Sequence, residues 1–321
     1  MELVNPFREF YDSEVYVNYE KLHLPSFPYL LEIEPTNTCN MDCLFCARQI
    51  MKRPASYLDY DIYKNIIDEA RQYSHFVGIS SFSGWGEPLL HKDIFRMIDY
   101  ANKKNVLTSL ISNGLLLKKQ NVAKLLNAGV DHVKISLQGA NNAEYEKMRK
   151  KGVYDSIVRN VLRLVNYRNK NNYRTFIQAS TSITSETKKE VNAFVRFWEG
   201  IVDEIYVDYT KFQRIAKVDR VKEYLKGKKD IINSDGEIVD EYKMKTYRDK
   251  GCVDVNTRLV IHSNCNVPIC CSDFSHEMVL GNIKDSTLKE IWDSKKLLEI
   301  RNILKRNIKN IPFCSVCHNL R

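Results

Sequence analysis

The sequence IEPTNTCNMDCLFC, residues 33–46, places Cys39, Cys43 and Cys46 on one short segment with the spacing C-x3-C-x2-C. Thiolates are the protein ligands of iron–sulfur clusters, and a cubane cluster of four irons and four sulfides takes four of them. The next cysteine along the chain is Cys252. The segment therefore predicts a cluster with three irons bound by thiolates and a fourth iron open to a ligand that is not protein.

Zinc is the alternative metal for this segment, with buried structural thiols as a further alternative. Zinc sites usually combine C-x2-C with a second pair of cysteines or histidines nearby. The nearest histidines on either side, His23 and His75, are single and lie well outside the segment. The spacing therefore favours the iron–sulfur interpretation.

The cysteine content and the length indicate a reducing compartment. Nine cysteines in 321 residues are an odd number, whereas disulfide frameworks belong to short secreted chains. Residues 1–21 are charged and aromatic throughout and lack the apolar stretch of a secretory signal. No apolar run approaches the roughly 18 residues of a membrane span. We expect a cytoplasmic, oxygen-sensitive protein with no membrane partner and with room for one large and one small domain.

The formal net charge is +9, and basic residues are densest at 217–229 and 243–250. Such runs usually form a solvated face. The alternative interpretation is attraction for an anionic small-molecule substrate. No RNA- or DNA-binding motif is present, so we expect no nucleic-acid partner.

Strand and helix patterns alternate from about residue 29 to residue 209. The predicted strands are 30–34, 76–82, 106–111, 133–137, 174–182 and 205–208. The predicted helices are 60–73, 93–103, 118–127, 142–171 with a break near Gly152, and 186–199. This alternation predicts an α/β fold with a parallel sheet. Six units are too few for a closed eight-stranded barrel, so we expect a partial barrel with its chemistry at the carboxyl ends of the strands.

The cysteine segment resembles that of the radical S-adenosylmethionine (SAM) superfamily, including the aromatic Phe45 before the third cysteine. In that family the open iron chelates the amino and carboxylate groups of SAM, and one electron from the cluster cleaves SAM to a 5′-deoxyadenosyl radical. The resemblance implies an enzyme with a (β/α)6 partial TIM barrel. It also implies that Phe45 lies against the adenine, and that an electron donor such as flavodoxin or ferredoxin serves the cluster.

The run SGWGEP, residues 83–88, follows the second predicted strand and resembles the G-G-E-P motif of the family. Trp85 replaces one residue of the usual glycine pair, while Gly86, Glu87 and Pro88 keep their register. Glycine permits close backbone approach and unusual φ angles. The resemblance implies that Gly84, Gly86 and Glu87 meet the amino group of SAM.

Polar runs also follow the third and fourth predicted strands. Similar runs in the family contact the ribose and carboxylate of SAM, which implies this role for Asn113, Ser136 and Gln138. Arg149 resembles the family arginine that pairs with the SAM carboxylate, and its guanidinium fork suits that group. The alternative for each is a capping or turn residue.

Six further cysteines lie near the carboxyl end: Cys252, Cys265, Cys270, Cys271, Cys314 and Cys317. This region resembles the SPASM and twitch domains that follow many radical SAM cores. The resemblance implies a second 4Fe-4S cluster, and because the sequence ends four residues after the last cysteine, the one-cluster twitch form is favoured. Its implied ligands are Cys252, Cys270, Cys314 and Cys317. A structural zinc site is the alternative.

Two cysteines are left over by this assignment. Cys265 stands where the family has glycine, and Cys271 is an alternative to Cys270 as a ligand. Spare cysteines are usually small buried hydrophobes. The functional alternative is that Cys265 or Cys271 donates a hydrogen atom to a substrate radical.

The expected organisation is an N-terminal extension, a radical SAM core, a bridge and an auxiliary cluster domain, at residues 1–28, 29–212, 213–250 and 251–321. The one-cluster layout resembles that of aminocyclitol dehydrogenases, which predicts dehydrogenation or epimerisation of a sugar, aminocyclitol or nucleotide-linked sugar. A maturase of ribosomal peptides is the alternative, less favoured because the segment before Leu30 is short for a peptide-recognition domain. A non-catalytic metal-binding module is disfavoured by the SGWGEP run.

Overall fold

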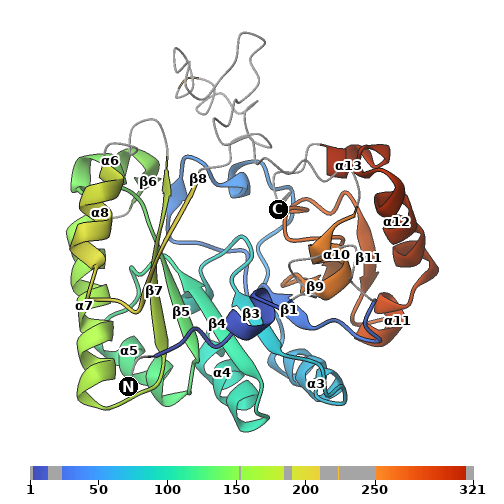
Figure 1. Cartoon of the computed structure of the whole chain (residues 1–321), viewed down its shortest axis with the longest axis horizontal. Helices are drawn as coiled ribbons and strands as arrows, with labels where there is room; N and C mark the ends of the chain where they lie inside the picture. Colours follow the sequence, from blue (N-terminus) through green and yellow to red (C-terminus); the bar gives the residue numbers. More distant parts are fainter. Residues whose placement is uncertain are drawn as a thin grey trace.

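The computed structural model describes residues 3–13, 24–151, 153–183, 190–209 and 251–315, together with Glu223. Its body is a seven-stranded sheet in the order β8-β7-β5-β4-β3-β1-β9, in which every neighbouring pair is parallel (Figure 1). The strands are β1 (Leu30–Ile33), β3 (Gly78–Phe82), β4 (Leu107–Ser112), β5 (His132–Leu137), β7 (Phe176–Ile183), β8 (Glu204–Tyr209) and β9 (Arg258–Ile261). The predicted α/β partial barrel is confirmed.

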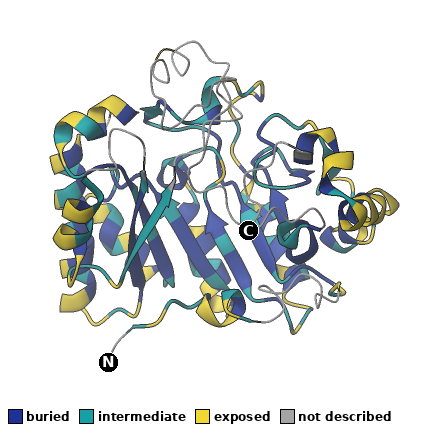
Figure 2. Ribbon diagram, turned by 45° about the horizontal axis from the view of Figure 1, so that its top comes forward, coloured by how far each residue is buried: buried dark blue, intermediate teal, exposed yellow. Residues whose placement is uncertain are grey.

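Helices pack on the outer face of the sheet (Figure 1). They are α3 (Tyr60–Ala70), α4 (Ile94–Lys103), α5 (Lys119–Asn127), α7 (Tyr154–Lys170) and α8 (Val191–Trp198). Each presents an apolar stripe to the sheet; in α3, Tyr63, Ile66, Ile67 and Ala70 are buried. The strands are largely buried, while the outer faces of the helices are exposed (Figure 2). The main core therefore lies between the sheet and its helices.

Alternation along the strands leaves a second, more polar face inside the barrel. In β5, Val133, Ile135 and Leu137 belong to the main core, so the intervening residues point inward because successive strand residues face opposite sides. The inward column is His132, Lys134 and Ser136. The same alternation places polar residues on the inner face of the neighbouring strands.

The predicted helix at 142–171 is divided. It consists of α6 (Asn142–Met148) and α7, separated by the two-residue strand β6 (Arg149–Lys150). The break predicted near Gly152 therefore exists, although Gly152 itself lies outside the described residues. The predicted helix at 186–199 begins outside them too, and its described part is α8. The predicted bridge at 213–250 is outside the described residues except for Glu223.

Strand β9 is an addition to the prediction, which assigned everything from residue 251 to a separate domain. β9 pairs with β1 in register from Leu30↔Arg258 to Ile33↔Ile261. It covers the edge of β1, which would otherwise present unpaired N–H and C=O groups. The prediction placed these residues with the C-terminal cysteines, and periodicity within a strand does not specify its pairing partner. The C-terminal region is thus joined to the barrel by the main sheet.

Small elements complete the C-terminal region, shown in orange and red in Figure 1. They are α10 (Val253–Thr257), the antiparallel strands β10 (Asn266–Pro268) and β11 (Val279–Asn282), α11 (Leu288–Trp292), α12 (Lys295–Arg306), η6 (Ile308–Asn310) and α13 (Pro312–Ser315). A capping box between Thr287 and Glu290 starts α11. The Glu69 carboxylate of α3 accepts hydrogen bonds from the backbone N–H groups of Leu288 and Lys289 at 3.0 and 2.8 Å. The region is therefore also docked on the outer helices.

An apolar cluster closes the amino-terminal end of the barrel. Phe7 precedes the short helix α1 (Arg8–Tyr11) and Phe10 lies within it; both pack with Leu30 and contact Leu107.

No described helix is long and apolar enough to cross a lipid bilayer.

Candidate functional site

The cysteine segment follows β1 and crosses the carboxyl ends of the strands. Its two-residue strand β2 (Asp42–Cys43) pairs antiparallel with β6, so that Cys43 lies opposite Arg149. The Leu44 backbone N–H also donates to the Met148 carbonyl at 2.8 Å. The segment is therefore tied to the chain that follows β5.

N–H groups lie near two of the three thiols of this segment, those of Cys39 and Cys43. The Met41 backbone N–H lies 3.4 Å from Cys39 Sγ, and Asn113 Nδ2 lies 3.8 Å from the same sulfur. Arg149 Nη1 lies 3.9 Å from Cys43 Sγ. Such donors suit thiolate ligands. Burial raises the pKa of Cys39 and raises that of Cys46 to about 11, but a coordinated metal deprotonates a thiol outright. The donor set therefore fits an iron–sulfur cluster.

Two glycines allow the SGWGEP loop to pack against the cysteine segment. Gly84 has a φ of +66°, and a Cβ there would lie 2.6 Å from the side chain of Glu34. A Cβ on Gly86 would lie 2.0 Å from the Thr36 carbonyl oxygen. The Glu87 backbone N–H donates to the Thr38 carbonyl at 2.8 Å. Both glycines are thus required by close approach of the two loops.

Glu87 connects the ends of β3 and β4 beneath the cysteine segment. Its carboxylate is buried and accepts hydrogen bonds from Ser112 Oγ at 2.9 Å, from the Asn113 N–H at 2.8 Å and from the Leu89 N–H at 3.1 Å. Burial raises the pKa of Glu87 to about 7, although these hydrogen bonds act in the opposite direction. The hydrogen bond from the Asn113 N–H to Glu87 holds the backbone of Asn113 in place, and the side chain of Asn113 reaches Cys39. A direct contact between Glu87 and SAM stays a prediction.

Arg149 collects the second group of predicted residues. Its Nη2 donates to Ser136 Oγ at 2.8 Å and to the Leu137 carbonyl at 3.2 Å, and its guanidinium lies 5.0 Å from the centre of the Phe45 ring. Gln138 follows Leu137 in the chain, and its Nε2 donates to the Ser182 carbonyl. The structure thus gathers most predicted cofactor-binding residues around the three cysteines.

The C-terminal cysteines are only partly covered by the described residues. Cys252 and Cys270 are half-buried and Cys314 is buried, while Cys317 lies outside the described residues. Among the residues that the structure covers, no three His, Cys, Asp or Glu side chains are gathered as ligands of a single metal ion. Because Cys317 lies outside the described residues, neither the four-cysteine cluster nor the zinc alternative is tested, and both stay predictions.

The two spare cysteines differ in environment. Cys265 is buried with a φ of +71°, a conformation that favours glycine, which explains why the family pattern has glycine there. Cys271 borders the cavity described below, and its carbonyl accepts a hydrogen bond from Trp85 Nε1 at 3.2 Å. Burial raises the pKa of the Cys271 thiol well above its ordinary value. Hydrogen donation by either cysteine stays a prediction.

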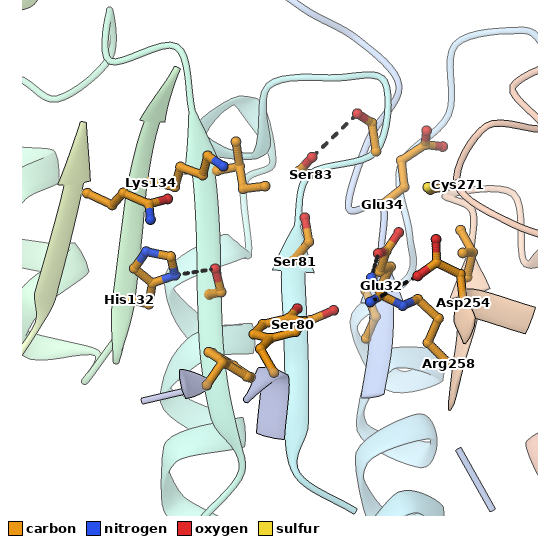
Figure 3. Close-up of a pocket in the computed structure, with 18 of the residues that line it drawn as sticks. Glu32, Glu34, Ser80, Ser81, Ser83, His132, Lys134, Asp254, Arg258 and Cys271 are labelled. Carbon is orange, nitrogen blue, oxygen red and sulfur yellow. Dashed lines mark hydrogen bonds and ion pairs between the residues drawn. The ribbon is translucent and has the colours of Figure 1, made fainter. Parts of the chain in front are cut away.

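A cavity of about 700 Å³ occupies the interior of the barrel. It extends from Phe45 and Trp85 at the carboxyl ends of the strands to Phe7 at the closed end. Figure 3 shows side chains of β5 on one wall and of β1, α10 and β9 on the other. Among the polar side chains that line it are Glu32, Ser80, His132, Lys134, Asp254 and Arg258.

The charged and polar groups of the cavity wall are mostly bonded to one another. Arg258 pairs with Glu32, and its Nη2 lies 3.2 Å from Asp254 Oδ1. On the opposite wall, Ser109 Oγ lies 2.9 Å from His132 Nδ1, and Lys134 Nζ lies 4.0 Å from the centre of the Tyr206 ring. None of these residues was identified from sequence as part of a site. The inward positions of the alternating strands were the signal that could have found them.

A buried ion pair of the barrel, between Arg53 and Glu34, also binds the C-terminal region through Ser263. The Arg53 guanidinium binds both carboxylate oxygens of Glu34 at 2.7 and 2.8 Å. Glu34 also accepts from the backbone N–H and hydroxyl of Ser263 at 3.1 and 2.8 Å and from the Trp85 N–H at 3.1 Å. Burial alone would raise the pKa of Glu34, but the contacts with Arg53 and Ser263 and the nearby His262 lower it to about 2.

Comparison with known proteins agrees with this geometry. Residues 33–197, just over half of the chain, match the radical SAM superfamily, and residues 252–318 match the SPASM iron–sulfur cluster-binding domain. The chain is 23% identical over 327 residues to the tungsten-containing aldehyde ferredoxin oxidoreductase cofactor-modifying protein of Pyrococcus furiosus, covering 89% of this chain and 86% of that protein. It is 20% identical over 295 residues to the SAM-dependent 2-deoxy-scyllo-inosamine dehydrogenase of Niallia circulans, covering 91% and 93%.

A solved structure shares the fold. The structure of Streptococcus suis SuiB bound to the precursor peptide SuiA superposes with a TM-score of 0.60 at 21% identity, covering 90% of this chain and 70% of that one. With the three-cysteine segment, the partial barrel and the C-terminal match, the chain belongs to the radical SAM superfamily, as an enzyme with a C-terminal SPASM domain and with SAM and 4Fe-4S clusters as its cofactors.

Proposed function

We propose that this enzyme oxidises a secondary alcohol of a small hydroxylated molecule, such as a sugar, aminocyclitol or nucleotide-linked sugar. The observation that carries the proposal is the cavity of about 700 Å³ whose wall is lined by hydroxyl, amide, imidazole and charged groups. Ligand sites of this size hold small molecules and use a few placed polar groups for specificity. Epimerisation of the same carbon is the alternative outcome.

Three cysteines hold the catalytic cluster in this proposal, and a second set of residues holds SAM. When bound, the cluster and SAM supply the 5′-deoxyadenosyl radical. Asn113 and Arg149 place N–H groups beside the thiols of Cys39 and Cys43. The proposed SAM-binding residues are Phe45, Gly84, Gly86, Glu87, Asn113, Ser136, Gln138 and Arg149.

The oxidation balances with the proposed auxiliary cluster as the second electron acceptor. The carbon–hydrogen bond of the substrate breaks homolytically, and its hydrogen atom completes the methyl group of 5′-deoxyadenosine. The hydroxyl group then loses its proton to solvent. Cys252, Cys270, Cys314 and Cys317 would hold the auxiliary cluster, which would supply the acceptor for the remaining electron as the carbonyl group forms.

A peptide substrate is the second candidate, as in a maturase of ribosomal peptides. The likeness to SuiB favours it in architecture. The small-molecule proposal is preferred because the cavity of about 700 Å³ has the size of sites that hold small molecules.

Substrate-dependent cleavage of SAM tests the proposal. The iron-loaded protein is incubated anaerobically with dithionite, SAM and one compound at a time: 2-deoxy-scyllo-inosamine, myo-inositol, a nucleotide-linked hexose or an unrelated precursor peptide. We expect a hydroxylated compound to raise 5′-deoxyadenosine formation, with deuterium transferred from the labelled carbinol carbon. Stimulation by the peptide alone would contradict the proposal.

A further inference from the structure

A histidine of the C-terminal region lies on the wall of the cavity. His262 follows β9 directly, borders the cavity and is completely buried. Its Nδ1 lies 2.8 Å from Nε2 of His276. Among the described residues, its Nε2 has no hydrogen-bond partner. A buried polar group without a partner costs about 1–3 kcal/mol, so this nitrogen is a candidate for binding a ligand atom.

A chain of hydrogen bonds fixes which nitrogen of His262 carries the proton. The Lys284 backbone N–H donates to Asn282 Oδ1 at 2.9 Å, so the amide nitrogen of Asn282 is the atom that donates to Asn266 Oδ1 at 2.8 Å. The amide nitrogen of Asn266 therefore faces His276 Nδ1, at 3.3 Å. An amide nitrogen only donates, so His276 Nδ1 accepts.

The same logic continues through the two rings. A neutral imidazole carries its proton on one nitrogen only. Because His276 accepts at Nδ1, its proton is on Nε2 and is donated to His262 Nδ1. The proton of His262 is consequently on Nε2, the nitrogen without a partner.

The surroundings keep His262 neutral. Burial lowers the pKa of His262 to about 3; the nearby Glu34 acts to raise it, and Arg53 and His276 act to lower it. Burial also lowers the pKa of His276. Both pKa values lie below the ordinary 6.5, so both rings are neutral above that pH and the relay keeps its direction there.

We propose that His262 is a substrate-contacting residue, a fixed N–H donor that the C-terminal region presents to an oxygen atom of the substrate. The inference rests on the proposed function, in which negative charge develops on the oxygen of the oxidised alcohol. A donor aimed at that charge stabilises the transition state. Because its tautomer is fixed, His262 donates at Nε2 and does not remove the hydroxyl proton. Asn266 and His276 are positioning residues.

The opposite wall supports a polar ligand. His132 is buried, borders the same cavity and also has an Nε2 without a hydrogen-bond partner among the described residues. The two imidazoles come from β5 and from the end of β9, on opposite sides of the barrel.

The first readout is the tautomer of His262, measured by ¹⁵N NMR of histidine-labelled holoenzyme with oxidised clusters. We expect a neutral His262 ring with its proton on Nε2 from pH 6 to pH 9. In the Asn266→Leu variant we expect a mixture of the two neutral tautomers. An Nδ1–H form, or protonation within this range, would overturn the inference. This readout does not depend on the substrate.

The second readout is turnover with 2-deoxy-scyllo-inosamine. We expect His262→Leu to lower kcat by about 100-fold, as for removal of a donor to a developing oxyanion, with substrate-free SAM cleavage unchanged. His262→Gln keeps an N–H donor and should recover part of the loss, without a new pKa in the pH profile. The control His75→Gln changes a ring that contacts the Phe27 carbonyl at 2.8 Å, and should leave kcat unchanged.

The two failures are distinguishable. Full turnover by His262→Leu would overturn the inference while leaving the proposed function intact. If no hydroxylated compound is turned over by the wild-type enzyme, the proposed function fails, and the tautomer measurement still decides whether His262 is a fixed donor.

Discussion

Replacing Glu34 with Gln removes one charge of the buried Arg53–Glu34 pair, which also binds Ser263 of the C-terminal region. Glutamine keeps the size of the side chain and leaves the Arg53 guanidinium buried without its counter-charge. Side-chain exposure in this pair is 4% for Arg53 and 0% for Glu34. We therefore expect the contact between the two regions to open more readily.

The structure gives two consistent measures of the cost. The pKa of Glu34 falls from an ordinary 4.5 to about 2, and at 1.36 kcal/mol per pKa unit this shift corresponds to about 3 kcal/mol. Removing one partner of a buried pair typically costs about 3–5 kcal/mol. A folded-state pKa below the unfolded value means that this stabilisation is present above pH 4.5 and is lost as the pH falls towards 2.

Hydrogen exchange of the Ser263 and Trp85 amides reports this contact, because both amides donate to Glu34. A loss of about 3 kcal/mol in the free energy of local opening accelerates their exchange by roughly a hundredfold. The control Asp61→Asn removes an exposed pair with Lys64 and should leave both rates unchanged. Acceleration of less than threefold in Glu34→Gln would refute the reasoning.

Three further changes have defined outcomes. Alanine at all three cysteines of residues 33–46 should lower the iron content from about eight to about four per chain, since each 4Fe-4S cluster contributes four; a wild-type value near four would remove the second cluster. Gly84→Ala should be more destabilising in urea than Gly200→Ala, because both have positive φ but only Gly84 meets a neighbour within 4 Å. Gly200→Ala alone should lower the free energy of unfolding by about 1–2 kcal/mol. Equal urea midpoints for the two variants would contradict the packing argument. Cys314→Ala combined with Cys317→Ala should abolish product formation while SAM cleavage persists, and full turnover without the second cluster would rule out a catalytic role for it.

The fold and the centre of the site were predictable because their signals are local. The spacing of Cys39, Cys43 and Cys46 is contained in a few residues, and the strands have buried outward residues that recur with period two. The role of Arg149 near the cofactor was expected from its resemblance to the family arginine. The pairing of β2 with β6 is what places Arg149 opposite Cys43.

The remaining features depend on contacts between distant segments. Arg53 meets Glu34 in a buried pair, although nothing in the neighbouring sequence of either residue marks it. Strand β9 joins β1 across more than 200 residues of chain. The relay to His262 uses side chains from β10, β11 and the loop between them. Sequence periodicity describes faces of single elements and cannot specify such pairings.

The most direct test of the account is the formation of 5′-deoxyadenosine from SAM by anaerobic, iron-loaded and chemically reduced protein. We predict slow formation by the wild-type chain without substrate, and none by the variant with Cys39, Cys43 and Cys46 replaced by alanine. Absence of 5′-deoxyadenosine from fully iron-loaded wild-type protein under strong reductant would contradict the central claim.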